Sequence, residues 1–175
     1  MYITQYTWKI GEFRLTEIKI RNVKEIDFLE IMEIATSCDP IPIERDSIYH
    51  NFTRYFANTC FVAEEGERIV GFVLGWISQV DDAIAYIHNI CVIPDMRKKR
   101  IATRLYDTFI QAVRELGCNK VLLIISPKNR NSLTFHQALG FKISEEGEGI
   151  EVDSIRAVKD YNGPGKHMVV MHKDI

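Results

Sequence analysis

A strand, a long amphipathic helix and a second strand follow one another in the middle of the chain, and this order constrains the fold more than any other feature. The first strand is predicted over Ala83 to Ile93 and ends at Pro94. From about Lys98 to Leu116 apolar residues recur at mostly helical spacing, and Gly117 supplies the expected stop. Lys120 to Ile125 is a nearly continuous apolar run, which is typical of a central strand buried on both faces.

Further strands and helices are predicted on both sides of this unit. The strands are Thr16 to Asn22, Cys60 to Glu64, Arg68 to Trp76, Phe141 to Ser144 and His167 to His172. The helices are Ile26 to Thr36, about Glu44 to Phe56, and Asn131 to Leu139. Residues 1–15 could add an edge strand, and residues 145–165 form a polar stretch with a turn at 162–165. The order predicts one α/β domain over residues 1–175, with a mixed sheet and helices on both faces.

Composition narrows the class of protein. Hydrophobic residues make up 46% of the 175 residues, which is enough for a core without disulfides. The formal net charge of −2 argues against a nucleic-acid surface or an acidic-membrane surface. The longest apolar run, residues 69–77, contains glycines and is too short to span a bilayer. We therefore expect a soluble protein with no nucleic-acid or membrane partner.

The cysteine pattern favours reduced thiols. The four cysteines are Cys38, Cys60, Cys91 and Cys118, with no CxxC pair and no zinc-ligand spacing. Cys91 lies inside an apolar run, where it is expected to behave as a small buried hydrophobic side chain. A reduced, cytoplasmic setting without a metal site is the simplest prediction.

The loop after Pro94 brings unpaired backbone N–H groups and the positive end of a helix dipole to one place. A pyrophosphate is the natural ligand for such a place, and Ala102 keeps the backbone approachable. Four basic residues add positive charge around it: Arg97, Lys98, Lys99 and Arg100. Many helices begin with basic residues only as a solvated face, so spacing alone leaves both interpretations open.

The same residues resemble the coenzyme loop of the GNAT superfamily, the general-control-related N-acetyltransferases, which reads V-x-P-x-x-[QR]-x-x-G-x-[GA]-x-x-L. The matching residues are Val92, Pro94, Arg97, Ala102 and Leu105. Arg100 stands where the family usually has glycine, and an arginine suits that position if its φ is negative. The resemblance implies a mostly antiparallel, twisted sheet of about seven strands. It also implies that acetyl-CoA binds at Ile90, Cys91, Val92, Arg97, Lys98, Lys99, Arg100, Ile101, Ala102 and Thr103.

A second motif lies downstream at the family's distance. Residues 129–141 resemble the pattern N-x-x-[AS]-x-x-[FL]-Y-x-x-x-G-F, through Asn129, Ser132, Phe135, Gly140 and Phe141. The resemblance adds Asn129, Ser132, Phe135 and His136 to the coenzyme contacts. His136 stands where the family commonly has a tyrosine that is thought to protonate the departing sulfur. A histidine with a reference pKa of ~6.5 could do the same, or could only pack beside the coenzyme.

Two polar side chains are candidates for the base that deprotonates the amine. On a strand, Tyr86, His88, Ile90 and Val92 share one face, which places two polar side chains near the thioester end. We favour His88 as the base, with a water bound by Tyr86 as the competing arrangement and a purely structural His88 as the third. In the family a backbone N–H of this strand holds the oxyanion, which falls here around residues 90–92.

These observations predict an N-acetyltransferase that moves the acetyl group of acetyl-CoA to a primary amine by direct attack in a ternary complex. The acceptor is expected to be a small molecule or an amino acid. The alternatives are a protein N-terminal or lysine acetyltransferase, and a non-catalytic acyl-CoA sensor. Residues 55–64 are also similar to diaminobutyrate acetyltransferases, although His136 fits that subgroup less well. A homodimer is a further expectation, because dimers are frequent in such proteins.

Overall fold

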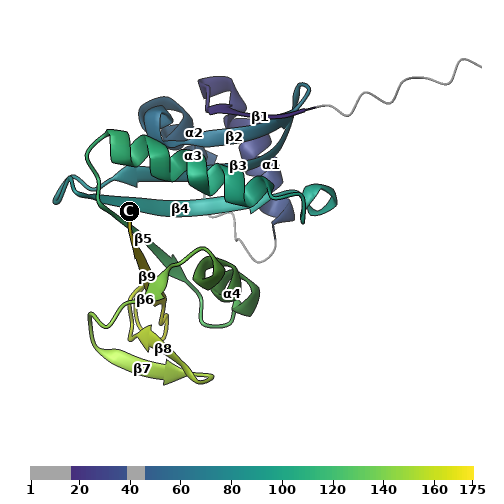
Figure 1. Cartoon of the computed structure of the whole chain (residues 1–175). Helices are drawn as coiled ribbons and strands as arrows, with labels where there is room; N and C mark the ends of the chain where they lie inside the picture. The colour runs from purple at the N-terminus through teal and green to yellow at the C-terminus, as the bar shows by residue number, and fades with distance from the viewer. Residues whose placement is uncertain (1–16, 39–45) are drawn as a thin grey trace, which may run out of the picture.

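A sheet of seven strands forms the frame of the computed structural model, which describes residues 17–38 and 46–175 (Figure 1). Its strand order is β1-β2-β3-β4-β5-β9-β6. The strands are β1 (Ile18–Asn22), β2 (Phe61–Glu65), β3 (Arg68–Ile77), β4 (Ile84–Val92), β5 (Lys120–Ile125), β6 (Lys142–Ile143) and β9 (Val169–Asp174). All neighbours are antiparallel except β4 and β5. The predicted mixed, mostly antiparallel sheet is therefore confirmed.

Within the described residues, four α-helices cover the sheet. They are α1 (Phe28–Ser37), α2 (Asp46–Tyr55), α3 (Ile101–Glu115) and α4 (Arg130–Ala138). In Figure 1, α3 lies over one face of β2 to β4, while α1 and α2 lie behind the other face. Helix α3 packs closely, because a Cβ atom at Gly75 of β3 would lie 2.5 Å from the Phe109 ring of α3. The prediction of helices on both faces is confirmed.

The strands β4 and β5 run side by side for a short distance only. Their parallel pairing joins Ile84–Tyr86 to Lys120–Leu122, and no further pair is formed between these two strands. Beyond this point they diverge, and α4 lies beside the open end of β5 (Figure 1). The main-chain groups of β4 that face the opening, from residue 87 onward, are not used by β5.

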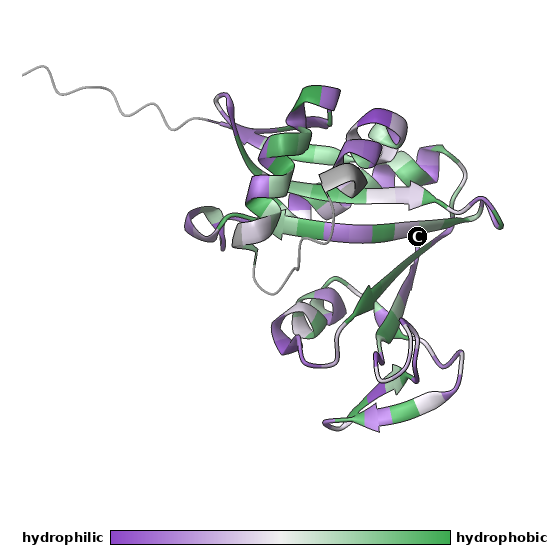
Figure 2. Cartoon of the chain, turned by 180° about the vertical axis from the view of Figure 1, so that it is seen from behind, coloured by the Kyte–Doolittle hydropathy of each residue, from purple (hydrophilic) through white to green (hydrophobic). Residues whose placement is uncertain are grey.

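A β-bulge interrupts β4 at its centre. The register pairs Leu74 of β3 with Asn89, and the next residue, Gly75, with Ile87. His88 is therefore an extra residue that reverses the alternation of side chains along the strand. A polar interruption in the middle of the otherwise mostly apolar β4 is visible in Figure 2.

The bulge corrects the predicted side-chain directions. Ile90 and Val92 pair with residues of β3 that lie on the face of the sheet covered by α3, so their own side chains lie on that face too. The His88 ring instead stacks on Phe52 of α2, with ring centroids 5.1 Å apart, and Tyr86 contacts a tryptophan on that same side. The expectation that all four residues share one face is wrong, because regular alternation does not survive an inserted residue.

A two-stranded hairpin lies within the polar stretch for which we predicted no strand. It consists of β7 (Gly149–Val152) and β8 (Ile155–Val158), which form a separate antiparallel sheet. The two turn residues, Asp153 and Ser154, have φ values of 50° and 62°. Such a turn usually carries glycine or asparagine, so the sequence lacked the usual hairpin signal.

The cysteine pairing also differs from the expectation. A disulfide joins Cys38, at the end of α1, to Cys91 of β4, while Cys60 and Cys118 are buried free thiols. The prediction that all four thiols are reduced and that Cys91 is only a buried apolar side chain is therefore wrong. The two partners are 53 residues apart in the chain, and only the fold brings α1 and β4 together.

Alkylation of the denatured chain is expected to separate the two kinds of cysteine. Without reductant, iodoacetamide should modify Cys60 and Cys118 only, and after reduction it should modify all four thiols. In the native protein Cys60 should react slowly, because burial raises the pKa of its thiol to about 12. Intact-mass spectrometry reads the number of adducts, and four adducts without reductant would contradict the pairing.

An ion-pair cluster fastens the edge of the sheet. The Arg21 guanidinium of β1 donates to both carboxylate oxygens of Asp27, at 2.7 and 3.1 Å, and to Glu64 of β2 at 2.7 Å. The Asp27 side chain is only 6% exposed, and it also accepts the Lys24 backbone N–H at 2.6 Å. This cluster ties β1, β2 and the turn before α1 together.

Two expectations fall on residues that the structure does not describe. The edge strand proposed within residues 1–15 lies outside the described residues, as does the predicted start of the second helix at Glu44. Within residues 17–38 and 46–175, no helix is long and apolar enough to cross a membrane. No group of three or more histidine, cysteine or acidic side chains in these residues could hold a metal ion.

Candidate active site

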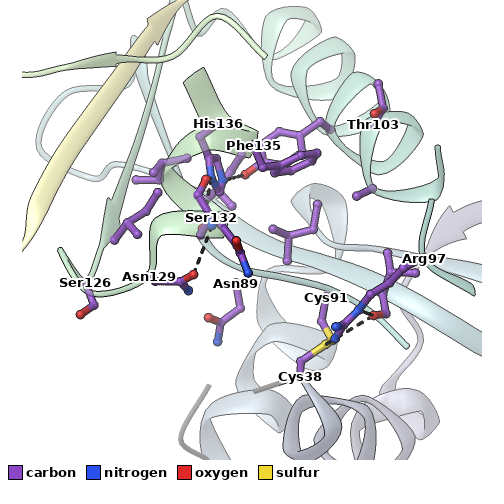
Figure 3. Close-up of a pocket in the computed structure, with 18 of the residues that line it drawn as sticks. Cys38, Asn89, Cys91, Arg97, Thr103, Ser126, Asn129, Ser132, Phe135 and His136 are labelled. Atoms are coloured by element: carbon purple, nitrogen blue, oxygen red, sulfur yellow. Dashed lines mark hydrogen bonds between the residues drawn. A yellow bond between two sulfur atoms is a disulfide. The ribbon is translucent and has the colours of Figure 1, made fainter. Parts of the chain in front are cut away.

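A cleft of about 1020 Å³ opens where β4 and β5 diverge. Its walls are the second half of β4, the loop after it, the first turns of α3, the end of β5 and the start of α4 (Figure 3). The sheet creates this space, because β4 and β5 stop pairing after three residues. Main-chain groups on the open side of β4 therefore face a ligand rather than a neighbouring strand.

The loop between β4 and α3 has an unusual backbone. Lys98 and Arg100 have φ values of 64° and 60°, and Arg100 is the residue that precedes α3. The condition under which an arginine suits this position, a negative φ, is not met, and the left-handed conformation gives a physical reason for the glycine that the family pattern has there. No side chain caps the N-terminus of α3, and residues 101–103 line the cleft. Their N–H groups come before the first helical hydrogen bond, which Arg104 donates to the Arg100 carbonyl, and such N–H groups suit an anion.

Arg100→Gly is expected to raise the free energy of unfolding by about 0.5–1 kcal/mol, because glycine adopts a positive φ without a steric penalty. Arg100→Ala is the matched control, since it removes the same charge but keeps the Cβ. Urea unfolding followed by circular dichroism measures both variants. Equal stability of the two variants would contradict the backbone argument.

Positive charge is concentrated along the cleft. Five basic residues line it, namely Arg97, Lys98, Arg100, Lys128 and Arg130, and none of its described lining residues is acidic. Arg97 does not point freely outward, because its Nε donates to the Val92 carbonyl at 3.0 Å and its Nη2 lies 3.8 Å from Cys38 Sγ (Figure 3). Arg97 thus supports the end of β4 as well as adding charge.

An aromatic cluster adjoins the bulge on the side of α2. The His88 ring, on the exposed surface of the cleft, stacks on Phe52, and its centroid is 5.7 Å from that of Trp76. Trp76 in turn contacts Tyr86, with centroids 4.7 Å apart. Burial, together with the nearby Tyr161, raises the pKa of Tyr86 well above its ordinary value. The Tyr86 hydroxyl therefore keeps its proton near pH 7, whereas His88 is both accessible and of a suitable type.

On the opposite wall, His136 of α4 is held by both ring nitrogens. Nδ1 lies 2.6 Å from the carbonyl oxygen of Ser132, and Nε2 is hydrogen-bonded to the hydroxyl of Tyr106. The histidine is only 5% exposed, and burial lowers its pKa, although the bond to the Ser132 carbonyl acts in the other direction. His136 is therefore neutral near pH 7.

The start of α4 is shaped by its own sequence. Asn129 caps the helix, with its side-chain oxygen accepting the Ser132 N–H at 3.1 Å (Figure 3). The cap fixes the first turn of α4 at the rim of the cleft. Asn129, Ser132, Phe135 and His136 all line the cleft, on the wall that faces the α3 loop.

The cleft brings together nearly all of the residues proposed from the sequence. Tyr86 and Lys99 are the exceptions among them, and the Lys99 amine instead contacts the Met96 sulfur at 3.1 Å. Sequence reasoning missed other lining residues, including Asn89, Tyr106, Ser126, Lys128 and Met168. Asn89 was missed because the bulge was not foreseen, and Tyr106 because its helical spacing reads as core.

Comparison with known proteins places the chain among acetyltransferases. The profile of the acetyltransferase (GNAT) family matches residues 28–141. L-2,4-diaminobutyric acid acetyltransferase of Halalkalibacterium halodurans is 31% identical over 57% of this chain and 53% of that protein. The chain thus spans about half the length of this curated relative.

Solved structures show the same architecture. Ard1 from Thermoplasma volcanium superposes with a TM-score of 0.75 at 18% identity, over 90% of this chain and 97% of that one. A diaminobutyrate acetyltransferase from Paenibacillus lautus, in complex with L-2,4-diaminobutyric acid and coenzyme A, gives a TM-score of 0.69 at 19% identity, over 91% and 99% of the two chains. At these identities the similarity shows the fold.

Proposed function

The chain belongs to the acetyltransferase (GNAT) family, and on this premise we propose that it transfers the acetyl group of acetyl-CoA to the primary amine of a small molecule. One observation carries the proposal. A single cleft combines an open strand edge, a basic loop that ends in an uncapped helix N-terminus, and a histidine on each of two opposite walls. This combination suits a long, phosphorylated thioester that meets an amine at its far end.

The coenzyme end of the cleft fits acetyl-CoA as a substrate. The N–H groups of residues 101–103 and the basic side chains around them suit the pyrophosphate. The free edge of β4 at Ile90 to Val92 suits the pantetheine amides, which would pair with the main chain as a strand does. A backbone N–H near the bulge would also stabilise the oxyanion that develops on the acetyl carbonyl.

The amine must lose a proton before or during attack. An alkylamine with a pKa of ~10.4 is neutral to only a few parts in 10⁴ at pH 7, so a base is useful. His88 is the favoured base, because it is accessible in the cleft and sits at the bulge. Tyr86 remains the competing site through a bound water, but the raised pKa of its buried hydroxyl keeps it protonated near pH 7, so that little phenolate is present to act as a base.

His136 faces the same region from α4 and is the candidate source of the proton for the leaving sulfur. A thiolate with a pKa near ~8.5 leaves more readily when a donor is in reach. His136 takes the position of the family's tyrosine and lines the cleft. The contribution of general acid catalysis is typically 10²- to 10⁴-fold in rate.

A small amine is the acceptor that the comparisons favour. The curated relative is named for diaminobutyric acid, and one solved neighbour holds that compound with coenzyme A. A protein N-terminus is the second class of acceptor, because another relative, 29% identical over 73% of this chain, is named the N-terminal acetyltransferase complex ARD1 subunit homolog of Dictyostelium discoideum. A sensor that binds acetyl-CoA without turnover is the remaining alternative.

Three further parts of the proposal concern the whole protein. We propose that residues 1–175 form one acetyltransferase domain, a view supported by the pairing of β9, near the end of the chain, with central β5. A homodimer and a cytoplasmic location complete the proposal. Light scattering after size-exclusion chromatography tests whether the protein is a homodimer, and cell fractionation tests the cytoplasmic location.

Thiol release from acetyl-CoA tests the function directly. We expect free thiol to appear only when a small primary amine is added, from a panel of diamino acids, polyamines, arylalkylamines and peptides with free N-termini. Release with peptides alone would move the acceptor class to proteins. Tight binding of acetyl-CoA with no thiol release on any amine would instead support the sensor.

Arg97→Ala is expected to raise the Kd for acetyl-CoA about tenfold, because the substitution removes a cleft charge and frees the Val92 carbonyl. Arg114→Ala, in the last turn of α3 and outside the cleft, is the matched control and should leave the Kd unchanged. Titration calorimetry measures both. The same Kd for the two variants would mean that the loop does not hold the coenzyme.

A further inference from the structure

The hydroxyl of Tyr106 and the imidazole of His136, which is labelled in Figure 3, form a buried hydrogen-bonded pair that lines the cleft. Tyr106 comes from α3 and His136 from α4, so the pair bridges two walls of the cleft. The side chains are 1% and 5% exposed, and the rings of Phe135 and Phe141 pack against both. Neither motif that identified the site includes Tyr106.

The partners of His136 determine where its proton lies. A carbonyl oxygen only accepts, so Nδ1, at 2.6 Å from the Ser132 carbonyl, carries a hydrogen. In neutral His136 the Nε2 atom is then an acceptor, and the Tyr106 hydroxyl must donate to it. Neutral His136 thus has no free donor for a ligand in the cleft.

Protonation of His136 reverses this bond. A proton on Nε2 turns that nitrogen into a donor toward the Tyr106 oxygen, which frees the hydroxyl hydrogen to point elsewhere. Tyr106 lines the cleft, so the cleft is a direction in which that hydrogen can point. The hydroxyl also adds a second hydrogen-bonding group next to the imidazole, at a place where both residues line the cleft.

We propose, on the basis of the acetyltransferase function above, that Tyr106 gives the proton directly to the coenzyme sulfur and that His136 replaces that proton in the same step. Tyr106 is then a catalytic residue of this chain, and His136 acts through it. The pair performs the role that the family pattern assigns to a single tyrosine at position 136.

The step balances as a two-proton relay. When the bond between the acetyl carbon and sulfur breaks, its electron pair goes to sulfur and the carbonyl re-forms. The Tyr106 hydroxyl proton moves to sulfur, and the His136 Nε2 proton moves to the Tyr106 oxygen. His136 takes this Nε2 proton from solvent in the cleft before the step, because it is neutral near pH 7. Coenzyme A leaves as the thiol, Tyr106 is unchanged, and His136 returns to its neutral form.

Burial explains why the two protons should move together. It raises the pKa of Tyr106 well above the ordinary value of 10, so a phenolate left behind by transfer to sulfur alone would be costly. It lowers the pKa of His136, so the imidazolium gives up its proton readily. Burial thus disfavours both the Tyr106 phenolate and the His136 imidazolium. A concerted transfer of the two protons avoids forming the phenolate.

Tyr106→Phe removes one oxygen and keeps the ring, so it tests the relay with little change in packing. We expect kcat to fall about 100-fold, with the KM for acetyl-CoA and the Kd for coenzyme A within about twofold of wild type. Tyr49→Phe is the control matched in burial, since Tyr49 is 3% exposed on α2 and does not line the cleft. A wild-type kcat in Tyr106→Phe would overturn the relay.

The double variant Tyr106→Phe/His136→Ala separates a relay from two independent effects. If the two residues act as a unit, kcat of the double variant should be about 100-fold below that of the wild type, which is the loss expected for the slower single variant. Multiplied losses of about 10⁴-fold would mean that the two side chains act separately, and would sink the proposal.

A measurement on the wild-type protein keeps the test independent of variant folding. Thiol release is followed under single-turnover conditions in mixtures of H₂O and D₂O, with the small amine that supports turnover. Two protons moving in one step should give a curved dependence of rate on deuterium fraction, whereas a straight line or no isotope effect would overturn the relay. Absence of any thiol release from the wild type would instead contradict the proposed function itself.

Discussion

His136→Ala is expected to lower kcat about 100-fold while the Kd for acetyl-CoA changes by less than about threefold. The large effect on kcat follows because the substitution removes the source of the proton for the leaving sulfur, and general acid catalysis contributes at least this much. A 100-fold loss corresponds to about 2.7 kcal/mol of transition-state stabilisation. The small effect on binding follows because the basic side chains of the cleft, including the loop before α3, remain in place when only the His136 imidazole is removed.

The control is His50→Ala, because His50 faces Glu25 and Phe28 and does not line the cleft. Initial rates of thiol release give kcat, and calorimetry with coenzyme A gives the affinity. Loss of affinity with an unchanged kcat would show that His136 only supports the coenzyme. The variant also leaves the Tyr106 hydroxyl without its partner, so its folding must be checked by circular dichroism.

The second large effect is on stability. Arg21→Met is expected to lower the free energy of unfolding by about 2–3 kcal/mol, because it leaves the Asp27 carboxylate buried without its guanidinium partner. Loss of a fully buried pair costs about 3–5 kcal/mol, and the smaller figure allows for the 25% exposure of Arg21.

Arg54→Met is the matched control for Arg21→Met. Arg54 and its partner Glu25 are 52% and 59% exposed, so this ion pair should contribute less than about 0.5 kcal/mol. Urea unfolding curves give both free energies. Similar losses of unfolding free energy in the two variants would show that the buried ion-pair cluster contributes no more to stability than an exposed ion pair. Asp27 would then be stabilised by other contacts, such as the Lys24 N–H.

The sequence allowed the sheet to be predicted because its central strands β3, β4 and β5 are long and mostly apolar. The seven predicted strands correspond to β1 to β6 and β9, and both motifs fall on strand, loop and helix as expected. The hairpin β7–β8 escaped notice because its turn, Asp153-Ser154, contains no glycine. Local patterns reveal an element only when the turn that joins its strands carries a recognisable residue.

The site was predictable in its residues but not in its geometry. The two motifs indicated most of the residues that line the cleft. The bulge at His88 was not foreseeable, because it depends on how β3 pairs with β4. The positive φ of Arg100 and the contact between Tyr106 and His136 depend on tertiary structure in the same way. Such features arise from segments that are distant in the sequence, and no local spacing encodes them.

The early divergence of β4 and β5 has a consequence for how such a chain can evolve. A ligand that lies along the open edge of β4 is recognised in part by peptide groups, which every amino acid provides alike. Side chains in the cleft can therefore drift without abolishing that share of the affinity. This tolerance agrees with the preservation of the architecture at 18% and 19% identity. The residues that contact the acceptor can then change while the mode of binding of the donor stays the same.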